Sequence, residues 1–286
     1  MNFSSFISFP APAKLNLFLH VTGQRENGYH DLETVFQFLD YGDTLDLSTN
    51  ETGQIQLLTP ITGIKHSDNL IVKAATLLQK KTQCEKGVQI RIDKILPMGG
   101  GLGGGSSNAA TVMLALNALW ELNLSIETLC TLGLQLGADI PIFLHGHAAF
   151  AQGVGEIFSP ITPTEYWYLI SKPACSISTQ AVFTSPDLPR HTPPLSLAKL
   201  DIDLCQNDCQ TMVIKHYPEV ANLLAWLVEY APSRMTGTGA CIFSRFNSKK
   251  EAIALQNKLP DKIESFVAKG INRSPLLDAI DGIVNT

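Results

Sequence analysis

LPMGGGLGGGSSNAATVMLALNALW, residues 96–120, is the stretch that decides the fold of this chain. Six of the seven residues from 99 to 105 are glycine. Each glycine enlarges the unfolded ensemble, at a cost of roughly 0.4 to 1 kcal/mol of stability relative to alanine. So many glycines together indicate a backbone that must approach another group closely.

An apolar helix follows these glycines without a polar spacer. Ser106, Ser107 and Asn108 are residue types that favour helix N-termini, and apolar residues then recur at helical spacing through residue 119. The free amides and the positive dipole end of a helix N-terminus together bind phosphate. We therefore predict a phosphate-binding loop; the alternative is a tight structural turn.

Composition limits the class of protein. The 286 residues allow one large or two modest domains. With 21 basic and 26 acidic residues the net charge is −5, which argues against broad binding to nucleic acid or to anionic membranes. The six cysteines are scattered, as in reduced cytoplasmic proteins, and Cys205 and Cys209 lack the second ligand pair of a zinc site.

No membrane segment or cleaved leader is expected. The uncharged run 95–120 is longer than a membrane span, but its first half is glycine and serine. The opening residues MNFSSFISF contain no basic residue and only a short apolar core. We expect the mature chain to start near Met1 and to reside in the cytoplasm.

Periodicity predicts a mixed order of strands and helices. A strand over 13–22 alternates apolar and other residues, which places Lys14 and Asn16 on one face. The remaining strands are expected at 44–48, 55–58, 88–96, 167–171, 241–245 and 264–268, and helices at 69–81, 125–136, 219–230 and 248–259. This order favours an α+β fold. Proline-rich stretches predict a domain boundary near Ser159, with domains 1–158 and 159–286.

The glycine loop matches more than one phosphate-binding motif. Gly99, Gly101 and Gly104 satisfy G-x-G-x-x-G, so a nicotinamide-dependent oxidoreductase is one alternative. The acidic residue which that fold needs would be Glu121, at the end of the helix and not after a second strand. A Walker loop is excluded because no Lys-Ser or Lys-Thr follows the glycines, and protein-kinase signatures are missing.

A loop without its own lysine needs positive charge from elsewhere to handle a transferring phosphoryl group. Lys14 is a candidate for that charge, and Asp139, in the apolar context LGADIPIF, is a candidate proton acceptor. Pro141 should end any helix before it. The alternatives are an exposed strand lysine and a turn or capping aspartate.

Four motifs together resemble one family: PAKLNLFLHVTGQRENGYH, PMGGGLGGGSSNAAT, LGADIPIF and TGTGAC. They are similar to those of the 4-diphosphocytidyl-2-C-methyl-D-erythritol kinases, in the superfamily of galactokinase, homoserine kinase, mevalonate kinase and phosphomevalonate kinase. The resemblance extends over residues 12–274. It implies a two-domain α+β small-molecule kinase that uses ATP to phosphorylate the 2-hydroxyl of its cytidine diphosphate substrate, in the non-mevalonate route to isoprenoid precursors.

The resemblance also implies roles for single residues. Lys14 and Asp139 resemble the catalytic pair of the family. The residues that resemble those holding the cytidine diphosphate part of the substrate are Asn16, Tyr29, His30 and Phe183. The ATP loop would comprise Pro97, Met98, Gly99, Gly100, Gly101, Leu102, Gly103, Gly104, Gly105, Ser106 and Ser107. The domain 1–158 would then bind the nucleotide and carry the catalytic residues, and the domain 159–286 would bind the substrate.

Three further points stay open in the sequence. TGTGAC resembles a turn that closes the site; the alternative is an ordinary hairpin. Mg²⁺ is expected with ATP, its protein ligands are not assigned beyond Ser106 or Ser107 as candidates, and His145 with His147 lacks a third ligand. The alternative functions are another kinase of the superfamily acting on a simple alcohol, and a nucleotide-binding regulator without catalysis.

Overall fold

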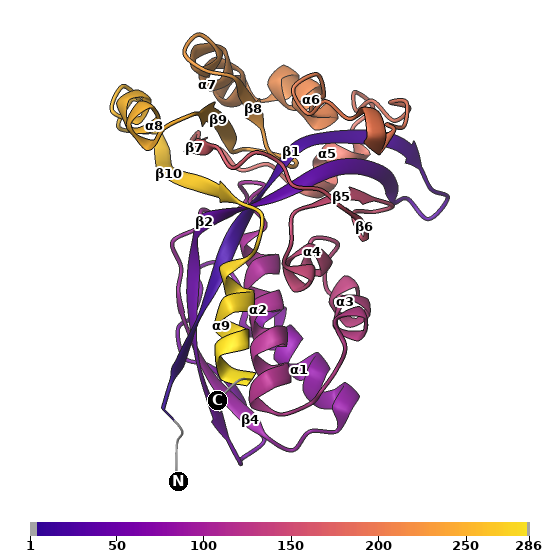
Figure 1. Ribbon diagram of the computed structural model, residues 1–286, viewed down its shortest axis with the longest axis vertical. Helices are drawn as coiled ribbons and strands as arrows, with labels where there is room; N and C mark the ends of the chain where they lie inside the picture. The colour runs from indigo at the N-terminus through magenta and orange to yellow at the C-terminus, as the bar shows by residue number, and fades with distance from the viewer. Residues whose placement is uncertain (1–4, 285–286) are drawn as a thin grey trace.

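Two long antiparallel strands form the spine of the protein, which the computed structural model describes over residues 5–284. Strand β1 (Ile7–Gln24) pairs with β2 (His30–Asn50) along almost its whole length. Figure 1 shows the pair running diagonally from the lower group of helices to the upper group. Residues from both ends of β1 and β2 can therefore contribute to a site between the two groups.

The described residues form ten strands in one connected sheet. Its main path runs β3 (Ile55–Leu57), β4 (Gly87–Asp93), β2, β10 (Glu264–Ile271), β7 (Trp167–Lys172), β9 (Ile242–Phe246), β8 (Ser233–Met235). Beside this path, β1 pairs with β2, and β5 (Ala149–Gln152) joins β2 to β6 (Ile157–Pro160). All these pairings are antiparallel except that of β3 with β4.

Helices cover the sheet in two groups. The lower group is α1 (Leu70–Thr82), α2 (Gly104–Leu119), α3 (Ile126–Leu134), α4 (Ile140–His145) and α9 (Pro275–Val284). The upper group is α5 (Thr179–Thr184), α6 (Asp208–His216), α7 (Pro218–Val228) and α8 (Lys249–Gln256). Within residues 5–284, none of these helices combines the length and the apolar character that a membrane crossing needs.

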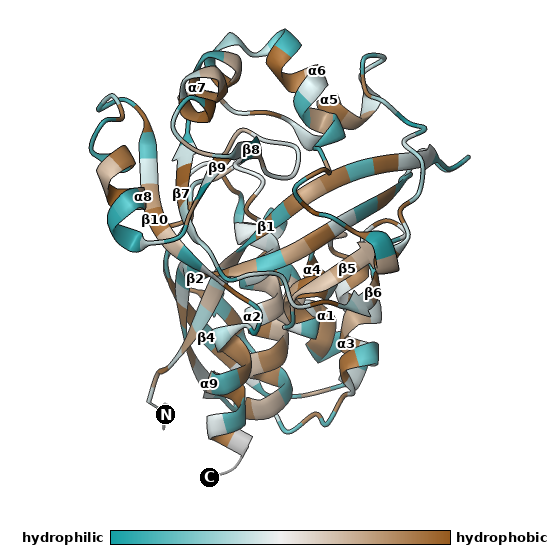
Figure 2. Ribbon diagram, turned by 45° about the horizontal axis from the view of Figure 1, so that its top comes forward, coloured by the Kyte–Doolittle hydropathy of each residue, from teal (hydrophilic) through white to brown (hydrophobic). Residues whose placement is uncertain are grey.

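Helix α2 is the centre of the lower group. Every residue from 107 to 116 is buried, and Figure 2 shows α2 brown over most of its length. Its side chains belong to one apolar cluster with residues of α1, β2 and α9. A helix that is apolar on all sides must be enclosed on all sides, so its N-terminus is held rigidly where the glycine loop enters.

The α+β class is confirmed, and so are most predicted elements, within one to three residues at their ends. Helix α1 begins after Asn69, whose side chain accepts from the Ile71 amide, and α3 begins after Ser125, which caps Thr128 in the same way. These N-caps are the local signals that made both helices predictable. Asn27 and Gly28, with Gly28 at φ 86°, lie in the turn that connects β1 and β2.

Three expectations differ from the structure. The strand predicted at 44–48 is the end of the 21-residue β2, because residues 33–39 of β2 are buried on both faces and show no alternation. Helix α2 begins at Gly104 and not at the serines, because Gly103 at φ 73° serves as its N-cap. Pro141 lies in the first turn of α4, where a missing N–H costs nothing.

The predicted division between residues 158 and 159 stays a prediction. Residue 159 lies within β6, and the chain returns to the lower group at its end, where α9 packs beside α2. The predicted start near Met1 lies outside the described residues.

A buried carboxylate anchors both ends of the glycine loop. Asp43 on β2 is almost completely buried and accepts hydrogen bonds from the amide of Leu96 (2.8 Å) and the side-chain amide of Asn108 (2.9 Å). It also pairs with Lys94 Nζ at 2.7 Å. Because Leu96 precedes the loop and Asn108 follows it, Asp43 fixes the two ends relative to each other.

The loop itself lies against the turn between β8 and β9. The amides of Ala240 and Cys241 donate to the carbonyls of Gly99 (3.3 Å) and Gly100 (3.2 Å). Gly101 has φ 75°, and a Cβ placed on it would lie 2.3 Å from the carbonyl oxygen of Thr236. Bare backbone is required here because two segments of main chain are in contact.

Replacing Gly101 by alanine should destabilise the protein. The left-handed conformation alone costs a side chain roughly 1 to 2 kcal/mol, and the clash with Thr236 adds to it, so urea unfolding should show a loss of about 2 kcal/mol or more. The control is Gly105→Ala in the first turn of α2, where the nearest atom to a new Cβ is 3.6 Å away and stability should hold or rise. Equal stabilities of the two variants would contradict this packing.

Candidate active site

One cavity of about 620 Å³ opens between the glycine loop, the pair of strands β1 and β2, and the upper group of helices with its strands, called the upper lobe below. Its wall includes Lys14 and Asn16 from β1, Asp139 from the start of α4, and Phe183 from α5. It also includes ten of the eleven predicted loop residues: Pro97, Met98, Gly99, Gly100, Gly101, Leu102, Gly103, Gly104, Gly105 and Ser106. Segments far apart in the sequence thus meet around one space.

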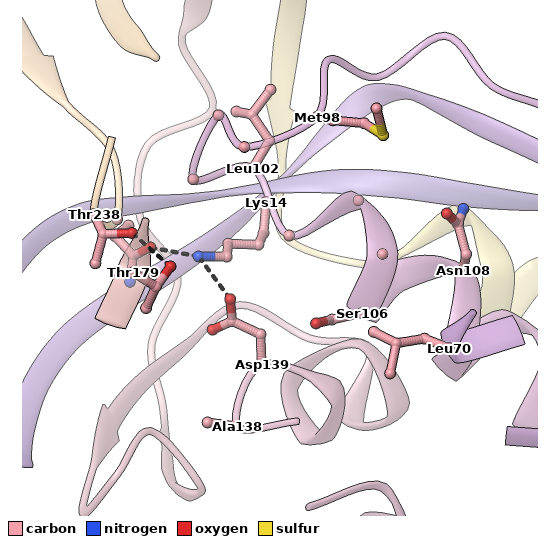
Figure 3. Close-up of a pocket in the computed structure, with 18 of the residues that line it drawn as sticks. Lys14, Leu70, Met98, Leu102, Ser106, Asn108, Ala138, Asp139, Thr179 and Thr238 are labelled. Atoms are coloured by element: carbon pink, nitrogen blue, oxygen red, sulfur yellow. Dashed lines mark hydrogen bonds and ion pairs between the residues drawn. The ribbon is translucent and has the colours of Figure 1, made fainter. Parts of the chain in front are cut away.

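Lys14 and Asp139 face each other across this cavity. The Lys14 amine lies 3.4 Å from an oxygen of Asp139, and the lysine side chain is only 3% exposed whereas the aspartate is 41% exposed. Figure 3 shows the amine pointing to Asp139, with Thr179 and Thr238 on one side and Ser106 on the other. A buried cation beside an accessible carboxylate can hold an anion and accept a proton at the same place.

The orientation of Lys14 comes from its strand and from its neighbours. Its backbone amide donates to the Leu102 carbonyl (3.1 Å), which ties β1 to the glycine loop. Its Nζ donates to Asn16 Oδ1 at 2.5 Å, as the predicted common face of a strand requires, and lies 5.2 Å from the centre of the Phe36 ring. The predicted alternative of an exposed strand lysine is therefore wrong.

The N-terminus of α2 supplies amide donors beside Lys14. The first amides of a helix have no acceptor within the helix, and in α2 these belong to Gly104, Gly105 and Ser106. A Cβ on Gly103 would lie 3.1 Å from the Lys14 Cε, so the loop backbone passes close to the lysine side chain. The combination of amides, helix dipole and ammonium suits a polyphosphate.

Ser107 is the one predicted loop residue that does not line the cavity. Its side chain is buried, and its hydroxyl donates to the Pro12 carbonyl at 2.7 Å. Ser106, on the preceding position of the helix, does line the cavity. The sequence could not separate the two serines, because the choice depends on which face of α2 meets β1.

The motif TGTGAC forms both a hairpin connection and a wall of the cavity. It links β8 to β9, and Gly237, Thr238 and Gly239 line the cavity. The Asn207 side-chain amide holds the turn by donating to the carbonyls of Met235 and Gly237, both at 2.8 Å. Beneath the loop, burial raises the pKa of the Cys241 thiol to about 12, so Cys241 acts as an uncharged packing residue.

Of the four predicted cytidine residues, Asn16 and Phe183 line the cavity, whereas Tyr29 and His30 lie outside its lining. The rings of His30 and Phe183 are 5.1 Å apart and 30° from parallel, while Tyr29 beside them is 59% exposed. Arg190 donates through Nε to His30 Nε2 (3.1 Å) and through Nη2 to the Phe183 carbonyl (3.0 Å). Burial, and then the Arg190 charge, lower the pKa of His30, so a neutral ring accepts from Arg190 and carries its proton on Nδ1.

Sequence reasoning missed several residues of the cavity wall. The polar ones are Thr34, Asp68, Asn69, Lys94, Asn108 and Thr179. Lys94 could have been found, since it precedes the glycine loop directly on the predicted strand. Thr34 carries no local signal, because it lies on a strand that is buried on both faces.

The described residues contain no group of three or more His, Cys, Asp or Glu side chains arranged to hold a metal ion. His145 and His147 have rings 5.6 Å apart, and His145 stacks on Phe158. Cys205 and Cys209 are both free and buried. His145 is partly buried and His147 is exposed.

Comparisons with known proteins agree with this geometry. The chain matches the profile described as the GHMP kinases N terminal domain over residues 69–147 and that of the GHMP kinases C terminal over residues 194–265. A 4-diphosphocytidyl-2-C-methyl-D-erythritol kinase of Colwellia psychrerythraea is 62% identical, with 96% of this chain and 93% of that protein covered. The protein of the same name from Aliivibrio fischeri is 59% identical over 94% and 93%.

Solved structures give the same result. A crystal structure of 4-(cytidine 5'-diphospho)-2C-methyl-D-erythritol kinase superposes with a TM-score of 0.81 at 29% identity, over 92% of this chain and 99% of that one. A mevalonate kinase from L. major shares the fold, with a TM-score of 0.67 at 17% identity over 95% and 97%. By sequence over nearly its full length, this chain belongs to the 4-diphosphocytidyl-2-C-methyl-D-erythritol kinase family, one of the GHMP kinases.

Proposed function

We propose that this protein transfers the γ-phosphoryl group of ATP to the 2-hydroxyl of 4-diphosphocytidyl-2-C-methyl-D-erythritol. The observation that carries the proposal is the 3.4 Å pairing of a buried Lys14 with an accessible Asp139 beside the N-terminus of α2. A polyphosphate on the helix amides would place its terminal phosphate next to both groups. The relatives with this name support the substrate.

The chemistry is a single displacement at phosphorus. The hydroxyl oxygen bonds to the γ-phosphorus, the bond from that phosphorus to the β,γ-bridging oxygen breaks, and ADP leaves with the bridging oxygen. Asp139 accepts the hydroxyl proton, and the Lys14 ammonium stabilises the charge on the γ-phosphoryl oxygens.

Magnesium completes the proposed nucleotide site. Bound with ATP, the ion would supply positive charge that neutralises part of the phosphate charge. The absence of a cluster of acidic or imidazole ligands among residues 5–284 fits an ion held mainly by phosphates and water. Of the two candidate hydroxyls we assign Ser106, because Ser107 donates its proton to Pro12.

The cytidine end of the substrate fits the aromatic residues at the hairpin of β1 and β2. Tyr29 and Phe183 offer ring faces that can stack on a pyrimidine, and His30 offers the Nδ1–H donor. Asn16 lines the cavity between this end and the catalytic pair. The substrate would thus span from the hairpin to Asp139.

The alternative of a nicotinamide-dependent oxidoreductase lacks its architecture. Helix α2 is followed by α3 and not by a parallel strand, and β4 before the glycine loop runs antiparallel to β2. A dinucleotide fold requires a parallel strand on each side of that helix. Glu121, the acidic residue needed on the second strand, ends α2 in a left-handed conformation.

We place the reaction in the cytoplasm, as the scattered cysteines predict. All six are free thiols in the structure, and Cys205, Cys209 and Cys241 are buried. Reduced, buried cysteines are typical of cytoplasmic enzymes.

The proposed function is tested by ADP release in a coupled assay with ATP and a panel of acceptors. We expect release that depends on 4-diphosphocytidyl-2-C-methyl-D-erythritol, with homoserine and mevalonate close to background. Faster turnover of a simple alcohol would show that the protein is another kinase of the superfamily. ATP binding without turnover of any acceptor would indicate a regulator. Tight NADH binding without ADP release would favour the alternative function of a nicotinamide-dependent oxidoreductase.

Asp139→Asn should fold and bind ATP but lose kcat by about 10²- to 10⁴-fold, the range for removal of a general base. Lys14→Met should lower kcat in the same manner. Exposed Asp261 gives the control Asp261→Asn, which should leave kcat unchanged. ATP affinity by calorimetry and kcat by ADP release separate binding from transfer, and near-normal turnover of Asp139→Asn would remove its assigned role.

Tyr29→Ala should raise KM for the cytidine substrate about tenfold, because stacking on a base contributes roughly 1 to 3 kcal/mol. KM for ATP should stay within twofold of the original value, since Tyr29 lies at the opposite end of the site. Tyr230→Ala removes an exposed tyrosine on the upper lobe and should change neither constant. Equal losses for both substrates would contradict the stacking role.

A further inference from the structure

The Lys14 ammonium has three N–H bonds and almost no contact with water, so each bond needs a defined acceptor. One points to Asn16 Oδ1 (2.5 Å) and another to Asp139 (3.4 Å). In the proposed function the third faces the transferred phosphoryl group. The direction of all three therefore depends on Asn16 presenting its oxygen, and not its NH₂ group, to the lysine.

The orientation of the Asn16 amide is set from its other side. Its Nδ2 donates to the Thr34 hydroxyl at 3.0 Å. That hydroxyl donates its own proton to the Phe18 carbonyl at 2.5 Å. A carbonyl oxygen can only accept, so the proton of Thr34 is committed and its oxygen is left as an acceptor. Only the NH₂ group of Asn16 can satisfy it.

The backbone of Asn16 is fixed independently. Its amide donates to Thr236 Oγ1 at 2.9 Å, across from the turn between β8 and β9. Asn16 is 3% exposed and Thr34 is 1% exposed, so a lost protein partner is not readily replaced by water even though both residues line the cavity. Turning the amide over would place NH₂ against the ammonium and the carbonyl oxygen against the lone pairs of Thr34, two repulsive contacts in a dry site.

From this chain of donors we infer that Thr34 is a positioning residue for phosphoryl transfer. Its hydroxyl fixes the amide of Asn16, and the amide fixes the Lys14 ammonium between Asp139 and the phosphate. The inference rests on the proposed function for its kinetic consequence, while the direction of the hydrogen bonds is independent of the substrate. Thr34 acts through Asn16 and needs no contact with the reacting atoms.

Thr34→Val keeps the shape of the side chain and removes the hydroxyl. We expect kcat for ADP release to fall about 10- to 100-fold, the cost of a slightly misplaced catalytic group, with KM for ATP within threefold of the original. Thr34→Ser restores the hydroxyl and should recover kcat to within threefold. Thr44→Val on the exposed part of β2 is the matched control and should be unchanged.

A double-mutant cycle separates positioning from general damage. In the Lys14→Met background, Thr34→Val should lower the residual rate by less than twofold, because the group that it positions is already gone. Unchanged kcat in Thr34→Val, or an equal loss with and without Lys14, would overturn the inference. Thr34→Ala gives the same comparison should the valine variant fail to fold.

A spectroscopic measurement does not depend on the substrate. A hydrogen-bonded, buried ammonium exchanges its protons slowly, so a ¹H–¹⁵N signal from Lys14 Nζ should appear in the original protein and in Thr34→Ser. It should be lost or broadened in Thr34→Val. If no acceptor is phosphorylated, the proposed function fails while this result still decides the role of Thr34; an identical signal in all three proteins would refute it.

Discussion

The contact of the glycine loop with the turn between β8 and β9 is the constraint on which the site depends. At Gly101 no side chain fits between the loop and the Thr236 carbonyl. This approach brings the upper lobe against the N-terminus of α2, and it leaves the first amides of that helix facing the cavity. Asp43 holds the same loop from the opposite side. The glycines at 99–105 lower the stability of the fold, but they allow this close approach and so create a fixed anion site.

The long strand pair delivers the other half of the site. Because β1 runs through both lobes, one segment supplies Lys14 beside the loop and the hairpin that carries Tyr29 and His30. Continuous pairing over Lys14 to Asn16 keeps these two side chains on one face, although bulges interrupt the register on either side. Lys14 and the hairpin with Tyr29 and His30 are therefore carried by one strand pair, whereas Asp139 and Phe183 come from α4 and α5.

The sequence predicted those features that depend on neighbours in the chain. Lys14 and Asn16 share a face because they are two residues apart in a strand, and the glycines before an apolar helix identify the anion site. The apolar context of Asp139 made it a candidate proton acceptor, but its approach to Lys14 could not be predicted, since it depends on how α4 packs against α2 and α3. The local sequence did not indicate the roles of Asp43, Thr34 and Arg190, because these roles depend on hydrogen bonds to residues of other elements. Residues 33–39 of β2 are buried on both faces, so they lack the period-two alternation by which a half-exposed strand is predicted, and the length of β2 was missed.

The most direct test is a crystal structure of the protein with a non-hydrolysable ATP analogue and 4-diphosphocytidyl-2-C-methyl-D-erythritol. The predicted result has the γ-phosphate at about 3 Å from amides at the start of α2, with the 2-hydroxyl between Lys14 and Asp139 and the cytosine beside Tyr29 and Phe183. A nucleotide bound away from the glycine loop, or a 2-hydroxyl directed away from Asp139, would contradict the convergence of loop, lysine and aspartate on one phosphoryl group.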